Sequence, residues 1–280
     1  MSFSKLGLIA GGGALPVTLA ERCTAAGRPL YVLRLRGFAG PEMSRFEGAD
    51  VGIAELGRAI DLLKRANCEA VCFAGLVSRP EFSSLRPDLR GMKALPRIIA
   101  AARHGDDALL RELLREFEKD GFRIEGAHEV DSGLTLGAGP LGAYGPDGHE
   151  ADIARALGAA RAIGQLDIGQ GAVAARGIVL AVEAQEGTDA MLARCAELPE
   201  ALRGTEAARR GVLAKAPKPI QERRVDMPTI GVATIEGAAA ARLAGVVGEA
   251  GAVLVVDRDA VIAAADRLGL FVFGVTPDAP

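Results

Sequence analysis

The sequence predicts an α/β fold of two domains: an N-terminal Rossmann-like parallel sheet and a C-terminal α/β domain, joined by a Gly/Pro-rich linker. Three observations predict it. Short apolar runs alternate with stretches of 3.6-residue periodicity through the first 130 residues. Glycine, proline and small residues then dominate up to residue 148, and the alternation resumes after them. We therefore expect domains at 1–132 and 149–280, the second carrying an acidic catalytic segment, and a linker at 133–148.

In the N-terminal domain, four apolar runs are expected to be strands because each is short and bounded by glycine or charged residues. They lie at 6–10, 30–35, 70–73 and 122–125. The periodic stretches between them predict helices at 16–26, 53–65 and 94–120. Strands that alternate with helices of this length favour a parallel sheet covered on both faces.

In the C-terminal domain, Arg176-Gly177 is typical of a two-residue hairpin turn between strands at 172–175 and 178–183. Periodicity predicts helices at 153–165, 189–197, 237–249 and 259–268. Two more apolar runs predict strands at 253–256 and 270–273. We find no internal repeat.

Composition restricts the classes of function. The chain has 280 residues, a formal net charge of −3, 36 Gly, 4 Cys and 3 His. This charge argues against nucleic acid as a partner, and so few Cys and His argue against a disulfide scaffold or an imidazole-rich zinc site. The first residues lack the apolar core of a signal peptide, and no apolar stretch is long enough to span a bilayer. We expect a cytoplasmic protein able to touch the membrane surface peripherally.

Glycines follow the first and third predicted strands. Gly11, Gly12 and Gly13 separate a strand from a helix, where the backbone can approach an anionic ligand closely. The alternative is a tight turn with no ligand. Pro16 stands where the dinucleotide fingerprint needs glycine, and Arg36 ends the second strand where it needs an acid, so NAD is disfavoured. Gly75 begins a second loop at the same edge of the expected sheet.

Other short motifs have structural alternatives. His104-Gly105-Asp106-Asp107 interrupts a helical region, where its acids would either cap the next helix or face a ligand. Cys68 and Cys72 do not have a zinc spacing and are expected to be buried.

Three carboxylates follow an apolar strand in the second half. Glu183, Glu186 and Asp189 fall within seven residues, and oxygen ligands gathered this way suit Mg²⁺ or Mn²⁺. Thr188 or Asp189 is alternatively a helix N-cap.

A basic stretch follows these acids. Residues 209–224 contain six Lys or Arg against one acid, Glu222. A solvated surface is one interpretation, but Lys215-Ala-Pro-Lys218-Pro is stiff and would hold cations where a pyrophosphate could meet them. Asp226 follows in a proline-terminated turn. Acids for a metal, lysine for phosphate and glycine for backbone approach together favour phosphoryl chemistry.

Six motifs occur in an order that resembles one family. They are Gly7-Leu-Ile-Ala-Gly-Gly-Gly-Ala-Leu-Pro16, Gly105-Asp-Asp-Ala-Leu-Leu-Arg111, Asp167-Ile-Gly-Gln170, Val182-Glu-Ala-Gln-Glu-Gly-Thr-Asp189, Lys215-Ala-Pro-Lys-Pro-Ile-Gln221 and Asp226-Met-Pro-Thr-Ile-Gly231. The chain resembles the UDP-2,3-diacylglucosamine pyrophosphatase of lipid A biosynthesis, of the type unrelated to calcineurin-like phosphoesterases. Glu222 and Met227 depart from the family pattern, where Asp and Leu are expected.

The resemblance implies a Mg²⁺-dependent hydrolase (Mn²⁺ being the alternative ion) that splits UDP-2,3-diacylglucosamine into UMP and 2,3-diacylglucosamine 1-phosphate, lipid X. It also implies a two-domain homodimer with the substrate between its domains, in the cytoplasm of a Gram-negative bacterium and in transient contact with the inner membrane. The family's essential aspartate maps onto Asp226, and its acidic pair onto Glu186 and Asp189. Water attack on the sugar-side phosphorus is the family's expected course.

We accordingly expect metal-assisted hydrolysis, with Asp226, Glu186 and Asp189 as metal ligands and catalytic groups and Lys215 neutralising phosphate charge. Substrate contacts are expected from Gly11, Gly12, Gly13, Gly75, His104, Asp106, Gln170, Gly187, Thr188 and Thr229. The alternatives are a nucleotide-sugar binding protein or transferase without hydrolytic activity, and a purely structural scaffold.

Overall fold

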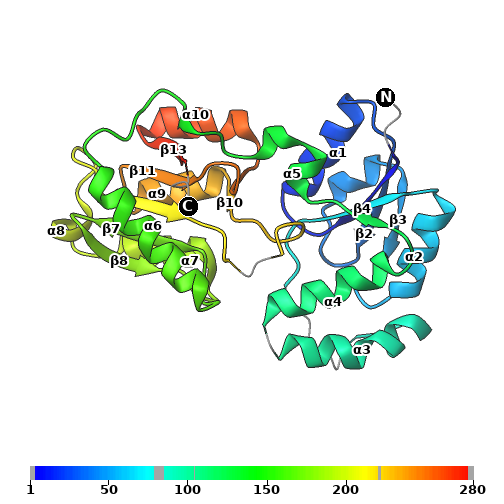
Figure 1. The fold of residues 1–280 in the computed structure, drawn as a ribbon. Helices are drawn as coiled ribbons and strands as arrows, with labels where there is room; N and C mark the ends of the chain where they lie inside the picture. The colour runs from blue at the N-terminus through cyan, green and yellow to red at the C-terminus, as the bar shows by residue number, and fades with distance from the viewer. Residues whose placement is uncertain (1–3, 79–84, 104, 220–221, 277–280) are drawn as a thin grey trace. The chain divides into compact units, whose positions relative to one another are not determined.

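The computed structural model describes residues 4–78, 85–103, 105–219 and 222–276 (Figure 1). The chain divides into two compact units. Unit 1 contains residues 1–132 together with 222–226, and unit 2 contains 133–221 together with 227–280. The segment 222–226, which carries Asp226, therefore groups with unit 1, whereas the sequence predicts it in the C-terminal domain.

Unit 1 is built on a five-stranded sheet with strand order β3-β2-β1-β4-β5, in which every pairing is parallel. Its strands are β1 (Leu6–Ala10), β2 (Leu30–Leu35), β3 (Gly48–Val51), β4 (Ala70–Ala74) and β5 (Arg123–Ile124). Its helices are α1 (Leu15–Ala25), α2 (Leu56–Arg65), α3 (Leu89–Ala102), α4 (Asp106–Glu118) and the single turn α5 (Ala127–Val130), with a 3₁₀ turn at Pro41–Arg45.

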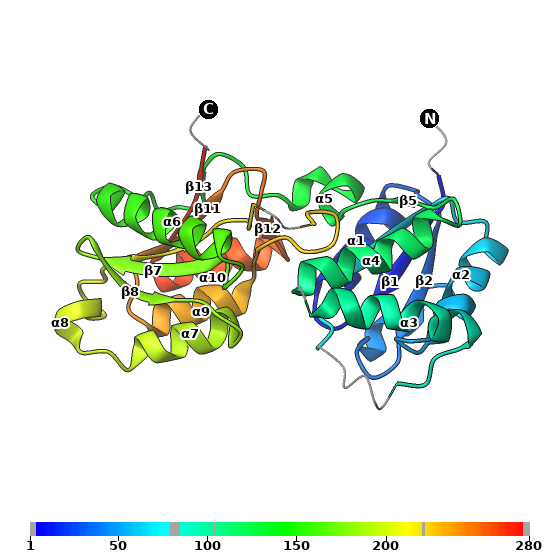
Figure 2. The same cartoon turned by 60° about the horizontal axis from the view of Figure 1, so that its bottom comes forward.

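Helices cover both faces of this sheet. Helices α2, α3 and α4 share one hydrophobic core with it. Leu63 of α2, Ala94 of α3 and Phe117 of α4 are among the buried residues of this core. Helices α1 and α5 contact each other, and α1 also contacts β1 and β2 (Figure 2). The parallel sheet covered on both faces is confirmed, and the carboxyl ends of its strands meet at one edge.

Unit 2 is built on a six-stranded sheet with order β6-β13-β11-β9-β7-β8. Strands β9, β11 and β13 are parallel to one another, whereas β6, β7 and β8 pair antiparallel. The strands are β6 (Gly139–Leu141), β7 (Gly171–Ala175), β8 (Ile178–Val182), β9 (Val212–Lys215), β11 (Gly245–Glu249) and β13 (Phe271–Val275); β10 (Thr229–Ile230) and β12 (Leu254–Val255) form a separate parallel pair. The helices are α6 (Glu150–Gln165), α7 (Gly187–Ala196), α8 (Glu200–Arg203), α9 (Val232–Ala240) and α10 (Arg258–Leu268).

The two faces of this sheet have different cores. Ala172, Ala174 and Ala214 pack with α6, where small side chains let the helix approach the strands. Val173 and Leu213, one residue along from them, face the opposite way into the core of α7, α9 and α10. This alternation follows from the two-residue period of a strand, and it fixes which side chains share a face at the strand ends.

The hairpin between β7 and β8 is confirmed. Arg176 and Gly177 have φ angles of 53° and 73°, the left-handed pair that a type I′ turn requires. The helix expected at 237–249 is wrong, because α9 ends at Ala240 and residues 245–249 form β11. Strand β11 lies between β9 and β13, so its apolar residues are buried on both faces and show no alternation.

The helix expected at 94–120 is two helices, α3 and α4, separated near Gly105. Strands β3 and β9 were not expected. Each is only four residues long, and β9 is buried along its whole length.

Residues 133–148, expected as a linker, are part of unit 2. Strand β6 pairs with β13, and Leu136 is fully buried in the core of the unit. Here the glycines serve close packing: a Cβ atom on Gly274 would lie only 1.7 Å from the carbonyl oxygen of Gly137. Over the described residues, the structure has no helix long and apolar enough to cross a bilayer.

Candidate functional site

The glycine loops after β1 and β4 bind each other through their backbones. Gly11 donates to the carbonyl of Ala74, and Gly12 and Leu76 exchange hydrogen bonds, all at 2.8 Å. A Cβ atom on Gly75 would lie 2.5 Å from the carbonyl oxygen of Gly12. The predicted close backbone approach is therefore between two loops of the protein, and the N–H groups of Gly11 and Gly12 are already used.

Gly13, the third glycine of the first loop, lies directly before the first turn of α1. Its φ of 83° lies in the left-handed region that favours glycine. The first N–H groups of a helix have no acceptor within it, so this turn is the part of the loop that can still donate to an anion.

The segment that carries Asp226 is held by α4. The backbone N–H of Glu222 donates to Asp107 Oδ1 over 2.6 Å, and Asp107 Oδ2 also pairs with Arg111. Helix α4 has Gly105 as its N-cap and no side-chain cap, so Asp107 is an anchor for the later segment rather than a cap. Asp226 itself is exposed, and its N–H donates to the carbonyl of Glu222.

Ion pairs stiffen the same segment. Arg224 pairs with Glu222 over 2.9 Å and with Glu118 of α4 over 2.8 Å. The hydrogen bond from Arg224 is the main reason why the pKa of the Glu222 carboxyl is lowered. Val225 packs against the core of unit 1. Asp226 thus ends a segment fixed by hydrogen bonds, ion pairs and one apolar contact.

Lys215 ends strand β9 in unit 2. Only 4% of the residue is exposed, and its Nζ donates to the carbonyl of Thr229 over 2.8 Å. The carbonyl of Gln170 accepts from the N–H of Ala216, directly after Lys215. The structure therefore brings together three of the predicted residues, Lys215, Gln170 and Thr229, at one end of this sheet.

The three carboxylates after β8 do not converge. Glu183 is buried and accepts a hydrogen bond from Thr188 Oγ1 over 3.0 Å. Glu186 and Asp189 are exposed, and Glu186 pairs with Arg194 further along α7. A hydrogen bond from its own backbone N–H, and then that from Arg194, lower the pKa of the Glu186 carboxyl. Among the described residues, these three carboxylates therefore do not form a ready-made set of oxygen ligands.

Gly187 begins α7 with a φ of 79°, and its N–H donates to the carbonyl of Ala184. Neither Thr188 nor Asp189 is the N-cap; Glu186 is, without a side-chain hydrogen bond. His104 lies outside the described residues, and Asp106 is described only through the backbone of α4.

A metal centre is not preformed in the described part of the chain, where no three His, Cys, Asp or Glu side chains lie close enough together to hold an ion. Mg²⁺ commonly takes only one or two carboxylates and completes its shell with substrate phosphates and water. The exposed carboxylate of Asp226 suits such a site.

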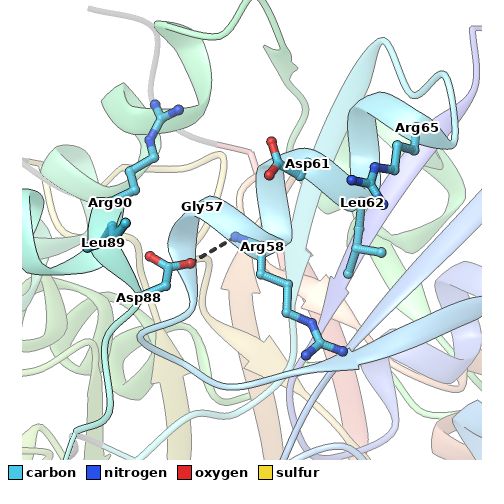
Figure 3. Close-up of a pocket in the computed structure, with 8 residues that line it drawn as sticks. All are labelled: Gly57, Arg58, Asp61, Leu62, Arg65, Asp88, Leu89 and Arg90. Atoms are coloured by element: carbon cyan, nitrogen blue, oxygen red, sulfur yellow. Dashed lines mark hydrogen bonds between the residues drawn. The ribbon is translucent and has the colours of Figure 1, made fainter.

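A hollow in the described structure lies elsewhere, between α2 and the start of α3 (Figure 3). It contains none of the predicted site residues; its lining is Gly57, Arg58, Asp61, Leu62, Arg65, Asp88, Leu89 and Arg90. Asp88 accepts from the backbone N–H of Arg58 and from that of Gly91, so it joins the first turns of two helices. The Asp88 carboxylate thus has a structural role, since both of its oxygens accept backbone hydrogen bonds. We therefore do not assign the catalytic site to this hollow.

Glu183 and Lys215 are both buried at the same end of the unit 2 sheet. The sequence groups Glu183 with Glu186 and Asp189 and does not associate it with Lys215. The register of the strands that carry Glu183 and Lys215 cannot be read from their spacing along the chain.

Two family models match nearly the whole chain: the LpxI N-terminal domain over residues 5–134 and the LpxI C-terminal domain over residues 138–273. A curated relative, the UDP-2,3-diacylglucosamine pyrophosphatase LpxI of Caulobacter vibrioides, is 67% identical over 274 residues, which cover 98% of each chain.

Two solved structures to which the chain is similar match it only weakly. A putative NAD-dependent epimerase/dehydratase from Methylobacillus flagellatus has a TM-score of 0.26 and 13% identity over 49% of this chain and 41% of its own. N5-carboxyaminoimidazole ribonucleotide synthetase from Thermotoga maritima has a TM-score of 0.22 and 16% identity over 66% of this chain and 42% of its own.

Proposed function

Because the chain belongs to the LpxI family, we propose that it hydrolyses the pyrophosphate of UDP-2,3-diacylglucosamine to UMP and 2,3-diacylglucosamine 1-phosphate, a step of lipid A biosynthesis. The observation that carries this proposal is the 67% identity to the pyrophosphatase of Caulobacter vibrioides over 98% of both chains. The aligned region spans both family-model domains.

Lys215 and Asp226 are the residues we propose for the chemistry. A buried ammonium at the end of β9 is a fixed positive charge, able to stabilise the charge that develops on a phosphate oxygen as the bond breaks. Asp226 would orient the attacking water and accept its proton. Asp226 and Thr229, whose carbonyl holds Lys215, are three residues apart along the chain.

We propose Mg²⁺ as the cofactor, with Mn²⁺ as an alternative ion, held by Asp226 and assisted by Glu186 and Asp189. When bound, the ion would neutralise charge on the phosphate oxygens. Glu186 would first have to leave Arg194, whereas Asp189 is exposed at the first turn of α7. The chain's own contribution is the anchored segment that holds the Asp226 carboxylate in place.

We also propose peripheral contact with an anionic membrane, because the substrate is a lipid. The described exposed large apolar residues of unit 1 all follow β3 or β4; they are Ile53, Leu76, Val77, Leu89 and Met92. Leu89 and Met92 lie on the first turns of α3, and Lys93 adds positive charge beside them. Apolar side chains rimmed by cations fit a bilayer that carries acidic lipids.

A cytoplasmic location and a homodimer complete the proposal. Sedimentation of the purified protein tests the dimer, and cell fractionation tests the location.

The reaction is tested by mixing the purified protein with Mg²⁺ and UDP-2,3-diacylglucosamine and measuring UMP. Equimolar UMP and sugar phosphate, both lost with EDTA and restored by Mg²⁺, are expected. Binding without UMP release would instead indicate a nucleotide-sugar binding protein or a transferase.

A further inference from the structure

Glu183 is the buried carboxylate whose surroundings the proposed reaction does not yet explain. Only 6% of the residue is exposed, at the end of β8. Thr188 donates to Oε1, but Oε2 is buried without a hydrogen-bond partner among the described residues. By contrast, the equally buried Glu116 pairs with Arg97 and Lys119, each over 2.6 Å.

Lys215 lies in the same row of the sheet as Glu183. Gly171 of β7 is in register with Lys215 of β9, and on its other side it accepts from the N–H of Glu183 over 2.8 Å. Residues in register across neighbouring strands point to the same face of a sheet. The row therefore runs carboxylate, glycine, ammonium, on the face where α7, α9 and α10 pack.

The glycine makes room for the carboxylate. A Cβ atom on Gly171 would lie 2.6 Å from Glu183 Oε2, and its other near neighbours are atoms of the same side chain. The carboxylate thus folds over Gly171, toward the strand that carries Lys215. An alanine at this position would displace the carboxylate without striking the backbone.

A carboxylate buried in this way destabilises the fold. Removing a charge from water is costly unless hydrogen bonds and an opposite charge replace the lost hydration, and here one oxygen has no donor among the described residues. A buried polar atom without a partner in a folded protein requires an explanation, and a functional role in which a ligand supplies the missing hydrogen bond is one. The missing partner of Oε2 is a hydrogen-bond donor, because an ionised carboxylate only accepts.

We propose that Glu183 and Lys215 form one subsite, in which Lys215 meets a phosphate of the substrate and Glu183 Oε2 accepts a hydrogen bond from a hydroxyl group of the adjoining sugar. This inference rests on the proposed function for the phosphate. Both sugars attached to the pyrophosphate carry free hydroxyl groups: the ribose of the nucleotide, and the glucosamine at the positions that are not acylated. Each is present in one reaction product.

Glu183→Gln tests the subsite in the full chain. Glutamine has the same shape as glutamate, but its amide N–H₂ group would replace Oε2 and could not accept the hydrogen bond from the substrate hydroxyl. Binding of UMP and of 2,3-diacylglucosamine 1-phosphate is measured separately by calorimetry. We expect one of the two to bind about tenfold or more weakly. Loss for UMP assigns the ribose, and loss for the sugar phosphate assigns the glucosamine.

Thermal unfolding separates this role from a structural one. Glu183→Gln should unfold at the wild-type temperature or above it, since it removes an uncompensated charge. Glu116→Gln is the matched control: a carboxylate of equal burial whose partners are in the chain, so it should lose stability and keep both affinities. Gly171→Ala should weaken binding of the same product. In the double variant with Glu183→Gln, the loss of binding free energy should be smaller than the sum of the two single losses.

The proposal is overturned if Glu183→Gln and Gly171→Ala bind both products within twofold of wild type, or if Glu183→Gln is destabilised as Glu116→Gln is. Failure of the proposed function has a different signature, namely a wild-type protein that releases no UMP. The binding measurements do not depend on turnover.

Discussion

The Nζ atom of Lys215 donates a hydrogen bond of 2.8 Å to the backbone carbonyl of Thr229, and both ends of this bond lie in unit 2. The bond fixes the ammonium at the end of β9 and joins it to the short pair of strands β10 and β12. A cation on a long flexible stem is thereby held in one place, as stabilisation of a developing charge requires.

Lys215→Met should lower kcat/KM by at least about 100-fold, because the fixed charge proposed to stabilise the phosphate oxygens is lost. UMP release at saturating Mg²⁺ measures it. Arg209→Met is the control, since Arg209 likewise donates to a backbone carbonyl, that of Ala239, over 2.8 Å. Comparable loss of activity in both variants would refute a specific role for Lys215.

Asp226→Ala should lower kcat by at least about 100-fold while the substrate still binds, because the carboxylate acts on water and metal rather than on substrate affinity. Near-normal kcat at saturating Mg²⁺ would show that the assignment is wrong. Glu186→Gln and Asp189→Asn should have smaller effects and should raise the Mg²⁺ concentration needed for half-maximal rate.

Asp107 should be a positioning residue for the segment that ends at Asp226. Asp107→Ala removes the acceptor of the Glu222 N–H, so kcat should fall severalfold and stability by about 1–2 kcal/mol. Asp107→Asn keeps an oxygen that accepts this hydrogen bond and should restore most of the activity. If both variants lose kcat equally, the backbone contact is not what matters. Steady-state kinetics and urea unfolding report the two effects.

Acid should destabilise the fold through Glu116. Burial acts to raise the pKa of this carboxyl, but the hydrogen bond from Lys119 and the charges of Lys119, Arg97 and Arg90 outweigh it, so the pKa is lowered from its ordinary 4.5. A carboxyl with a lowered pKa stabilises the fold above its unfolded-state pKa and loses that contribution as pH falls through the folded-state value. At pH values below 4.5, the urea concentration at the unfolding midpoint should therefore decrease with falling pH more steeply for the wild type than for Glu116→Gln. Parallel pH curves would contradict this assignment.

Leu89→Glu with Met92→Glu should weaken adsorption to vesicles that contain phosphatidylglycerol by about tenfold, because the two exposed side chains are 76% and 52% accessible. Vesicle flotation measures it. Leu166→Glu is a matched control, since Leu166 is 71% exposed in unit 2. Unchanged flotation together with a loss of the dimer would mean that a second copy covers this surface instead.

The sequence predicted regular elements best where local residues mark their ends, as the glycines after β1 do, although β1 itself is buried along its whole length. Strands β1 and β2 have the predicted bounds, and the β7–β8 hairpin has the predicted turn, because left-handed φ angles at Arg176 and Gly177 are a local property. Strand β11 falls within a predicted helix because its buried residues show neither period. Continuous apolar runs are ambiguous for this reason.

The sequence predicted which types of residue belong to the candidate site, but it did not predict which of them contact one another. Glu183 and Glu186 look alike in sequence, yet one folds over Gly171 and the other pairs with Arg194. That difference depends on the register of β7 and β8, which spacing along the chain does not reveal. Likewise, Asp107 and Glu222 are 115 residues apart, and only the folded chain places them in contact.

The grouping of residues 222–226 with unit 1 has a consequence for dissection of the protein. The chain passes from one unit to the other three times, so unit 1 is not encoded by one uninterrupted stretch. A fragment that ends at residue 132 would lack Val225, which packs on the core of unit 1, and Arg224, which pairs with Glu118. Such a fragment should therefore bind a separate peptide of residues 222–226, which would restore these contacts.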